Sequence, residues 1–314
     1  MNMSEATLDS QQIVDSAWQD QAIWSETANR LKIQLTTWRK SAAIAGIIGA
    51  FLETLVASMT GLGLSWLWIR TILALLGAII LAAVPYILKT KVSNDQVIKW
   101  VRARSVSEGL KETIYRYLLR VPPFGPASTP ADLIKDCQIL KNNVEDLGED
   151  AATVSPRRKE RPLTLTIDEY IENRVNDQIE HYYRPKAQEN ALAAKKLHGL
   201  EFFLGLLAVI LGAIAGAATA TGLPELSTLS PWVAVVTTAG AAVTAHLAAS
   251  RYDHQAMIYF STANRIKGVR DAWLATSDRL ESGRIAKFVD DIEHAISTEN
   301  EAWLAGWTGK KTGE

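Results

Sequence analysis

Glu53 is the residue in this sequence whose type and position most invite a chemical role. It stands inside an apolar run, SAAIAGIIGAFLETLVASMTGLGL, that begins at Ser41. Acidic side chains in such runs usually face protein or water, which makes them functional candidates. Two interpretations stay open: a polar group that serves a pore, or a protonated carboxyl that donates a hydrogen bond to a neighbouring backbone carbonyl or to Thr54.

His246 is a second titratable side chain in an apolar run, near the end of PWVAVVTTAGAAVTAHLAA. An imidazole changes its charge near physiological pH, which suits a sensor. A histidine that reaches the lipid headgroups is one interpretation of this position. A role in a pore or a sensor is the other.

The sequence contains no recognisable catalytic or metal-binding pattern. Cys137 is its single cysteine, and it has no glycine-rich phosphate loop, nucleophile elbow or metalloprotease helix. Asp253 and His254 are adjacent and point apart in a helix, so they form no dyad. A solvated helix face is predicted for Asp290, Asp291, Glu293 and His294. We therefore expect no enzyme activity, no cofactor and no metal.

Four apolar runs decide the expected fold class. They cover about residues 41–63, 70–88, 201–221 and 231–250. Roughly twenty apolar residues in a helix cross the hydrocarbon core of a bilayer, and no soluble domain needs adjacent helices that are apolar on every face. We predict an all-α membrane protein with two transmembrane helical hairpins and long cytoplasmic helices flanking each hairpin.

Proline-rich and charged segments divide the chain into domains. VPPFGPASTP and SPRRKERP enclose a short predicted helix at about 133–147. The expected division is a first two-transmembrane domain at 1–120, a linker at 121–164 and a second two-transmembrane domain at 165–314. Thr166 and Glu169 match a capping box, and Pro185 should kink or restart the helix that follows. Residues before about Asp20 look disordered or frayed.

Apolar residues at helical spacing predict buried seams on the flanking helices. The first seam is Trp24, Ala28, Leu31 and Leu35; the second is Tyr252, Ala256, Tyr259, Ala263 and Ile266; the third is Ile285, Val289, Ile292, Ile296 and Trp303.

Basic residues give the expected orientation in the membrane. The turns of the two hairpins hold only Arg70 and Glu225. The outer ends of the hairpins carry Arg39, Lys40, Lys89, Lys91, Lys195, Lys196 and Arg251. By the positive-inside rule, both termini and the central linker are cytoplasmic and the protein lies in the inner membrane. The net charge of -1 argues against nucleic-acid binding.

Small residues form stripes on two of the predicted spans. Ala42, Gly46 and Ala50 step by four in the first span, and Gly205, Ala208, Gly212 and Gly216 line the third. Such faces let helix backbones approach closely. They serve either packing within one chain or contact between protomers, and the second interpretation predicts a homo-oligomer.

Three groups of residues in the flanking helices form recognisable motifs. The second half carries Tyr170, Arg174, Gln178, Tyr183, Lys186 and Ala187, and it ends with Phe288, Val289, Glu293, Glu299 and Trp303. The first half carries Arg104, Glu108, Leu110, Lys111, Tyr115 and Tyr117. Together with the hairpins, these residues resemble two tandem copies of the SLATT family, two-transmembrane domains associated with nucleotide-sensing and SLOG-type sensors in bacterial conflict systems.

The resemblance implies a membrane effector that oligomerises and perturbs the membrane when a partner sensor is triggered. It carries over no catalytic residues, and it implies that the sensor is a separate cytoplasmic protein. The leading hypothesis is therefore a pore-forming or membrane-perturbing effector. A structural membrane scaffold that recruits a cytoplasmic partner is the alternative, and a small transporter or ion channel is the second alternative.

Overall fold

The computed structural model describes residues 3–59, 66–156, 164–221, 229–277 and 281–308. Within these ranges the regular structure is helical and contains no strand, which confirms the predicted all-α class. Residues 60–63 of the first predicted span and Glu225 of the second turn lie outside the described residues.

Four described stretches are long and apolar enough to cross a membrane: Ser10–Ser58, Leu67–Leu119, Ile167–Ala218 and Ser230–Leu274. At about 1.5 Å per residue, only roughly twenty residues of each are needed to cross the hydrocarbon core. The apolar parts of these stretches coincide with the predicted spans, and we expect the charged remainder of each to lie outside the lipid. The passage of the chain through the bilayer as two hairpins remains a prediction.

The chain forms two compact units, each built from segments of both halves. We call Met1–Ile33, Asn94–Gln188 and Ala256–Glu314 the polar unit. We call Gln34–Ser93 and Glu189–Gln255 the apolar unit, because it contains the four predicted spans. The predicted domains are consecutive stretches of the sequence, whereas each compact unit combines segments from both halves. The predicted domain boundaries therefore stay a prediction.

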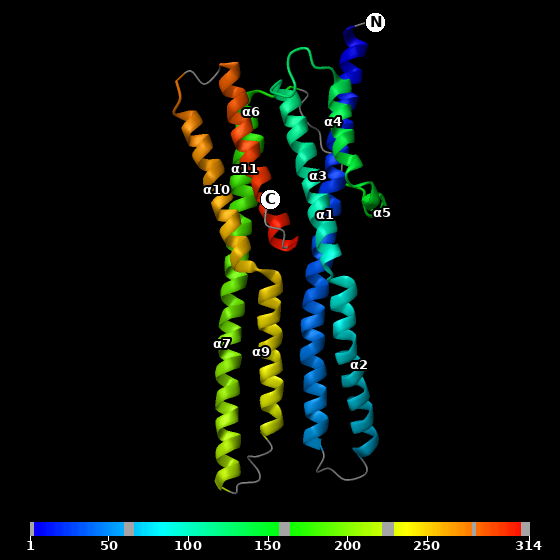
Figure 1. The fold of residues 1–314 in the computed structure, drawn as a ribbon, viewed down its shortest axis with the longest axis vertical. Helices are drawn as coiled ribbons and strands as arrows, with labels where there is room; N and C mark the ends of the chain where they lie inside the picture. The colour runs from blue at the N-terminus through cyan, green and yellow to red at the C-terminus, as the bar shows by residue number, and fades with distance from the viewer. Residues whose placement is uncertain (1–2, 60–65, 157–163, 222–228, 278–280, 309–314) are drawn as a thin grey trace. The chain divides into compact units, whose positions relative to one another are not determined.

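In the apolar unit, two helix pairs are joined by close contacts. The end of α1 (Met3–Ser58) lies beside α2 (Leu67–Lys91), and α7 (Arg184–Thr221) lies beside α9 (Ser230–Ser250) (Figure 1). Gly49 in α1 faces Leu81 in α2, and Gly240 in α9 faces Leu204 in α7. Phe51 and Trp232 make an edge contact with ring centroids 5.6 Å apart, which connects α1 to α9.

The polar unit is a helical bundle around α3 (Asn94–Leu119). Helix α11 (Ser282–Thr308) packs on α3. The remaining helices are the start of α1, α6 (Ile167–Tyr170), the start of α7, and α10 (Tyr252–Leu274). Most residues of the predicted seams line the core, since these are buried: Trp24, Ala28, Leu31, Ala256, Tyr259, Ala263, Ile266, Val289, Ile292 and Ile296. Tyr252 and Ile285 are only half-buried, Leu35 is buried in the apolar unit, and the Trp303 side chain lies outside the described residues.

The N-terminal segment is ordered, contrary to the expectation of a frayed stretch before Asp20. Helix α1 begins at Met3, and Val14, Ala17 and Trp18 are buried. The ring of Trp18 meets Tyr115 of α3 edge-on with centroids 5.4 Å apart. These apolar residues fall on one face of the helix, and burying that face on α3 stabilises a segment whose polar composition alone suggests disorder.

The segment between the halves is helical and packed on the bundle. It contains α4 (Pro130–Asn142), a 3-10 turn (Glu145–Leu147) and α5 (Gly148–Ala152). Leu133 and Leu147 are fully buried, and Lys141 pairs with Asp20 of α1 at 2.6 Å. The predicted short helix at 133–147 is therefore present, divided into two pieces.

The second half begins as its sequence predicts. Thr166 accepts a hydrogen bond from the Glu169 backbone, and the Glu169 carboxylate accepts one from the Thr166 backbone, so the capping box is formed. Two π-helical segments follow, Ile171–Asn176 and Gln178–Tyr183, and α7 starts at Arg184. Pro185 is the second residue of α7, and the helix runs through it without a break, so the expected restart at this proline does not occur.

Candidate functional site

Arg174 and Glu293 form the centre of a buried polar cluster in the polar unit. The guanidinium donates two parallel hydrogen bonds to the Glu293 carboxylate, Nε to Oε1 at 3.0 Å and Nη2 to Oε2 at 2.7 Å. Its Nη1 donates to Glu108 of α3 at 3.2 Å. Arg174 is 0% exposed and Glu293 1% exposed. These bonds hold the helical segment Ile171–Asn176, which contains Arg174, against α11 through Glu293 and against α3 through Glu108.

Aromatic side chains fix the orientation of this ion pair. The Tyr170 hydroxyl donates to Glu293 Oε1 at 2.8 Å. Tyr115 packs edge-on against Tyr170 with centroids 5.5 Å apart, and the Arg174 guanidinium lies 5.6 Å from the centre of the Tyr115 ring. Cation–π contacts of this kind stabilise a desolvated arginine. We call Tyr115, Glu108, Tyr170, Arg174 and Glu293 the arginine cluster.

The charges around the arginine cluster shift the pKa values of its members. Burial alone would raise the pKa of Glu108, but Lys111, Arg174 and Arg104 together lower it to about 2. Burial opposes the charge of Arg174, yet Glu293 and Glu108 raise the pKa of its guanidinium well above the usual value. Burial and the Glu293 charge raise the pKa of Tyr170. At neutral pH the cluster therefore holds a charged arginine beside the ionised carboxylate of Glu108.

A second set of ion pairs extends the cluster to the surface of the polar unit. Arg116 of α3 donates to Glu112 at 2.8 Å and to Asp290 of α11 at 2.8 Å. Burial of Glu112 and the charge of Glu293 raise the pKa of the Glu112 carboxyl. Asp290 is largely exposed, so the series of charges between α3 and α11 reaches solvent.

In the apolar unit, Glu53 faces the backbone of α2. A Cβ placed on Gly77 would come within 2.7 Å of Glu53 Oε1, so the carboxylate occupies the space that this glycine leaves. Thr54, the neighbour considered as a partner, is itself buried. The acid in the first span therefore packs against a neighbouring helix of the same chain.

The chain covers the predicted small-residue stripes only in part. Ala42 is buried, and Gly46 and Ala50 are half-buried. Among the described residues, no atom from outside the local helix backbone lies within 4 Å of a Cβ built on Gly46, Gly212 or Gly216. The close helix contact instead uses Gly49, where a Cβ would lie 2.6 Å from Leu81 Cγ. Space for a further side chain is therefore present at the first three glycines.

His246 bonds within the protein at the end of α9. Its Nε2 lies 3.2 Å from the Tyr252 hydroxyl. Arg251 brings the two residues together because it takes a left-handed backbone conformation, with φ 49°, that ends α9 and starts α10. Non-glycine residues rarely adopt this conformation, so the surrounding contacts must hold it.

Comparison with known families decides the identity of the chain. Residues 170–303 match the family described as SMODS and SLOG-associating 2TM effector domain 1, SLATT_1. Residues 20–132 match a family described as a protein of unknown function, DUF4231. Residues 170–303 therefore form a SLATT domain, and the two matches together support a SLATT-family protein. No curated protein and no solved structure matches it.

The SLATT domain and the four apolar helices together make this chain a membrane protein. The family description is consistent with a membrane effector of conflict systems. The matched SLATT segment begins at Tyr170 and ends at Trp303, which are the first and last residues of the motifs found in the sequence.

The structure brings some of the SLATT motif residues together and leaves others apart. Tyr170, Arg174 and Glu293 meet in the arginine cluster. Gln178 is buried one turn further along, and Lys186 is half-buried in α7. Glu299 and Trp303 belong to α11, but their side chains lie outside the described residues.

Glu293 corrects the expectation of a solvated acidic face near the C-terminus. Asp290 and His294 are exposed, whereas Glu293 is among the most deeply buried residues. Glu293 follows Val289 by four positions and precedes Ile296 by three, so the helical repeat places it on the buried face of α11. The same spacing in the sequence could have identified it as a buried partner for a basic residue.

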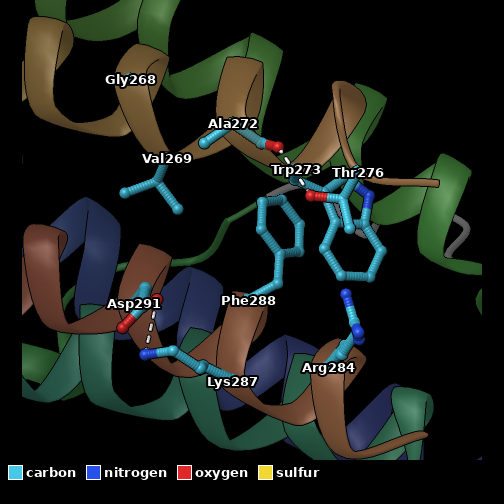
Figure 2. Close-up of a pocket in the computed structure, with 9 residues that line it drawn as sticks. All are labelled: Gly268, Val269, Ala272, Trp273, Thr276, Arg284, Lys287, Phe288 and Asp291. Atoms are coloured by element: carbon cyan, nitrogen blue, oxygen red, sulfur yellow. Dashed lines mark hydrogen bonds and ion pairs between the residues drawn. The ribbon is translucent and has the colours of Figure 1, made fainter. Parts of the chain in front are cut away.

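The SLATT domain also carries a groove between α10 and α11, with a volume of about 470 Å³. Figure 2 shows its floor, where the rings of Trp273 and Phe288 stack with centroids 4.5 Å apart. At its rim Lys287 pairs with Asp291 at 3.4 Å, and Arg284 pairs with Glu281 at 3.2 Å. The groove therefore combines an apolar floor with a rim whose charges are paired.

Within the described ranges, no group of three or more His, Cys, Asp or Glu side chains could hold a metal ion. Cys137 is buried in α4, and burial raises the pKa of its thiol to about 11. A thiol of this kind is a poor nucleophile, because the reactive species is the thiolate.

Proposed function

We propose that this SLATT protein is an oligomeric membrane effector of a bacterial conflict system, which forms a pore or otherwise perturbs the membrane when a separate sensor protein triggers it. Under this proposal the apolar unit is the effector and the polar unit receives the signal. The protein carries no catalytic step of its own.

The observation that carries the proposal is the open glycine face of α7. Gly212 and Gly216 are spaced for close helix contact, and among the described residues no other helix comes within 4 Å of a Cβ built on either glycine. Small-xxx-small faces drive helix association in lipid through close backbone packing. A second copy of the chain supplies the partner helix that a single chain lacks.

Large apolar side chains support the same proposal. Many of them remain exposed on α2 and α7 of a single chain: Ile72, Leu75, Ile79, Phe202, Leu206 and Val209. Lipid tails or neighbouring protomers would cover these side chains, because exposing so much apolar surface to water is unfavourable.

The proposed orientation places both termini and residues 121–164 in the cytoplasm. The basic residues at the ends of the four apolar helices support it through the positive-inside rule. The sensor would then act on the polar unit, where the arginine cluster joins α3, the π-helical segment and α11.

Expression of the full chain from an inducible promoter tests the proposal. We expect growth arrest with loss of membrane potential on triggering or overexpression, and dye release from vesicles that contain the purified protein. Gly212→Leu with Gly216→Leu should reduce both effects, because the added side chains separate neighbouring copies. Ala217→Leu adds similar bulk at an exposed position on another face of α7 and should leave both effects unchanged.

Two results would contradict the effector proposal. A strictly monomeric protein in detergent and in vesicles would exclude an assembled pore. An abundant oligomer that leaves the membrane potential intact would favour the structural scaffold, and substrate-dependent thermal stabilisation would favour a small transporter.

A further inference from the structure

The basic residues at one end of the apolar unit lie on neighbouring helices that contact one another. Lys91 at the end of α2 lies over the Trp38 ring of α1, with its Nζ 6.0 Å from the ring centre. This contact joins the basic ends of α1 and α2. Trp38 is 38% exposed, so one part of its ring faces outward.

A second contact lies at the junction of α9 and α10, where Arg251 stands between the two helices. There the Tyr252 hydroxyl lies 3.2 Å from His246 Nε2. This contact fixes the end of α9 at which the basic side chain of Arg251 is exposed.

The same junction contacts α7. His198 Nε2 lies 3.0 Å from Asp253 Oδ2, two residues after Arg251, and Lys195 and Lys196 precede His198 in α7. We define the basic collar as the basic residues at these ends of the apolar helices: Arg39, Lys40, Lys89, Lys91, Lys195, Lys196 and Arg251.

Two acidic residues close to the collar in the sequence, Asp253 and Glu201, are already engaged. Asp253 pairs with His198, and Glu201 accepts a hydrogen bond from Thr244 and lies 3.3 Å from His198 Nδ1. Glu53 lies against Gly77, away from the helix ends. Within the described part of the chain, no ion pair is made by the five lysines of the collar.

We propose that the basic collar binds the phosphate headgroups of anionic phospholipids in the leaflet that it faces, with Trp38 seated among the headgroups. The lysines stand where the apolar helices end, so their ammonium groups are at headgroup depth. An indole is favoured at the same depth. This inference uses only the membrane location of the chain, so it stands apart from pore formation.

The number of lysine ammonium groups without an ion pair sets the expected strength of binding to anionic lipid. A basic residue near an anionic membrane surface strengthens binding by about five-fold. Neutralising two collar lysines should therefore weaken retention of anionic lipid by roughly 25-fold, provided that the two act independently. Added salt should also weaken the retention of anionic lipid, because it screens the attraction between the lysines and the phosphates. The Debye length falls from about 10 Å at 0.1 M to about 3 Å at 1 M.

The test uses the purified full chain in a neutral detergent. Phosphatidylglycerol and phosphatidylcholine are titrated separately, and bound lipid is counted by native mass spectrometry. The test variant is Lys89→Gln with Lys91→Gln. The matched control is Lys135→Gln with Lys287→Gln, which removes the same charge from exposed positions of the polar unit.

We expect preferential retention of phosphatidylglycerol that falls by an order of magnitude or more in the collar variant and stays within about two-fold in the control. Equal retention of the two lipids would overturn the proposal, and so would equal losses in the two variants. Inorganic phosphate is the third arm: if it displaces phosphatidylglycerol at millimolar concentration, the collar is a site for free phosphate and the lipid proposal is wrong. Thermal unfolding of both variants confirms that each one is folded.

Discussion

The carboxylate of Glu293 receives two hydrogen bonds from the guanidinium of Arg174, a residue 119 positions earlier in the chain, and both side chains are buried. This pair joins the first and last helical segments of the SLATT domain. Glu108 of α3, in the first half of the sequence, accepts a hydrogen bond from the same guanidinium. The arginine cluster is thus a buried polar connection between the two halves of the sequence.

Breaking this pair from one side should destabilise the protein strongly. We expect Arg174→Met or Glu293→Leu to lower the free energy of unfolding by about 3–5 kcal/mol, because each leaves a buried charge without its partner. Arg184→Ala removes an arginine that pairs with Glu180 at 2.7 Å on the surface, and it should cost about 1 kcal/mol or less. Thermal or denaturant unfolding of the full chain in detergent measures both changes.

The double variant Arg174→Met with Glu293→Leu adds a sharper criterion. It should be less destabilised than the sum of the two single variants, because neither partner remains as an isolated buried charge. Additive losses would mean that the two side chains do not act as a pair.

Glu108 should make stability depend on acid pH. The pKa of its carboxyl is about 2 in the folded protein against an ordinary value of 4.5. A lowered pKa contributes stability that is present above about pH 4.5 and is lost as the pH falls towards 2. Glu108→Gln should therefore lower stability at neutral pH and flatten its decline between these two values. Melting temperatures across this range measure the difference, and Glu180→Gln at an exposed position should leave the decline unchanged.

Periodic signals in the sequence were sufficient for the helices but not for their polar contacts. Spacing of apolar residues located the spans and the seam through Tyr259 and Ile266, because hydrophobic burial acts on every turn of a helix. The capping box at Thr166 was equally local. The spacing around Glu293 indicates a buried position, but its pairing with Arg174 depends on tertiary packing, so no local pattern identifies which basic residue is the partner.

The glycines show the same limit. Spacing alone singled out Gly46, Gly212 and Gly216, whereas the contact within the chain uses Gly49 and Gly77. A stripe of small residues shows that close approach is possible, and only the position of the neighbouring helix decides which stripe is used. The order of α1 before Asp20 was missed for a related reason, since its stability comes from the α3 surface that covers Trp18.

Cys137 should report on opening of the polar unit. Its thiol is 4% exposed, and burial raises its pKa from 9.0 to about 11. The thiolate fraction is then about a hundred-fold below that of an ordinary cysteine, so iodoacetamide should label the native protein very slowly. Cys137→Ser with Gln138→Cys moves the thiol to an exposed position of the same helix and should restore fast labelling. Fast labelling of native Cys137 would mean that α4 is not packed as described.

Gly49 and Gly46 offer a matched test of the contact between α1 and α2. Replacing either by alanine favours the helix by about 0.5–1 kcal/mol. At Gly49 the new methyl would lie 2.6 Å from Leu81 Cγ, and overpacking of this kind costs about 1–3 kcal/mol. At Gly46 it would meet no atom within 4 Å. We therefore expect Gly49→Ala to unfold more readily than Gly46→Ala when monomeric protein is titrated with sodium dodecyl sulfate. Equal behaviour of the two variants would contradict the packing of Leu81 on Gly49, because helix propensity is the same for both and only this contact distinguishes them.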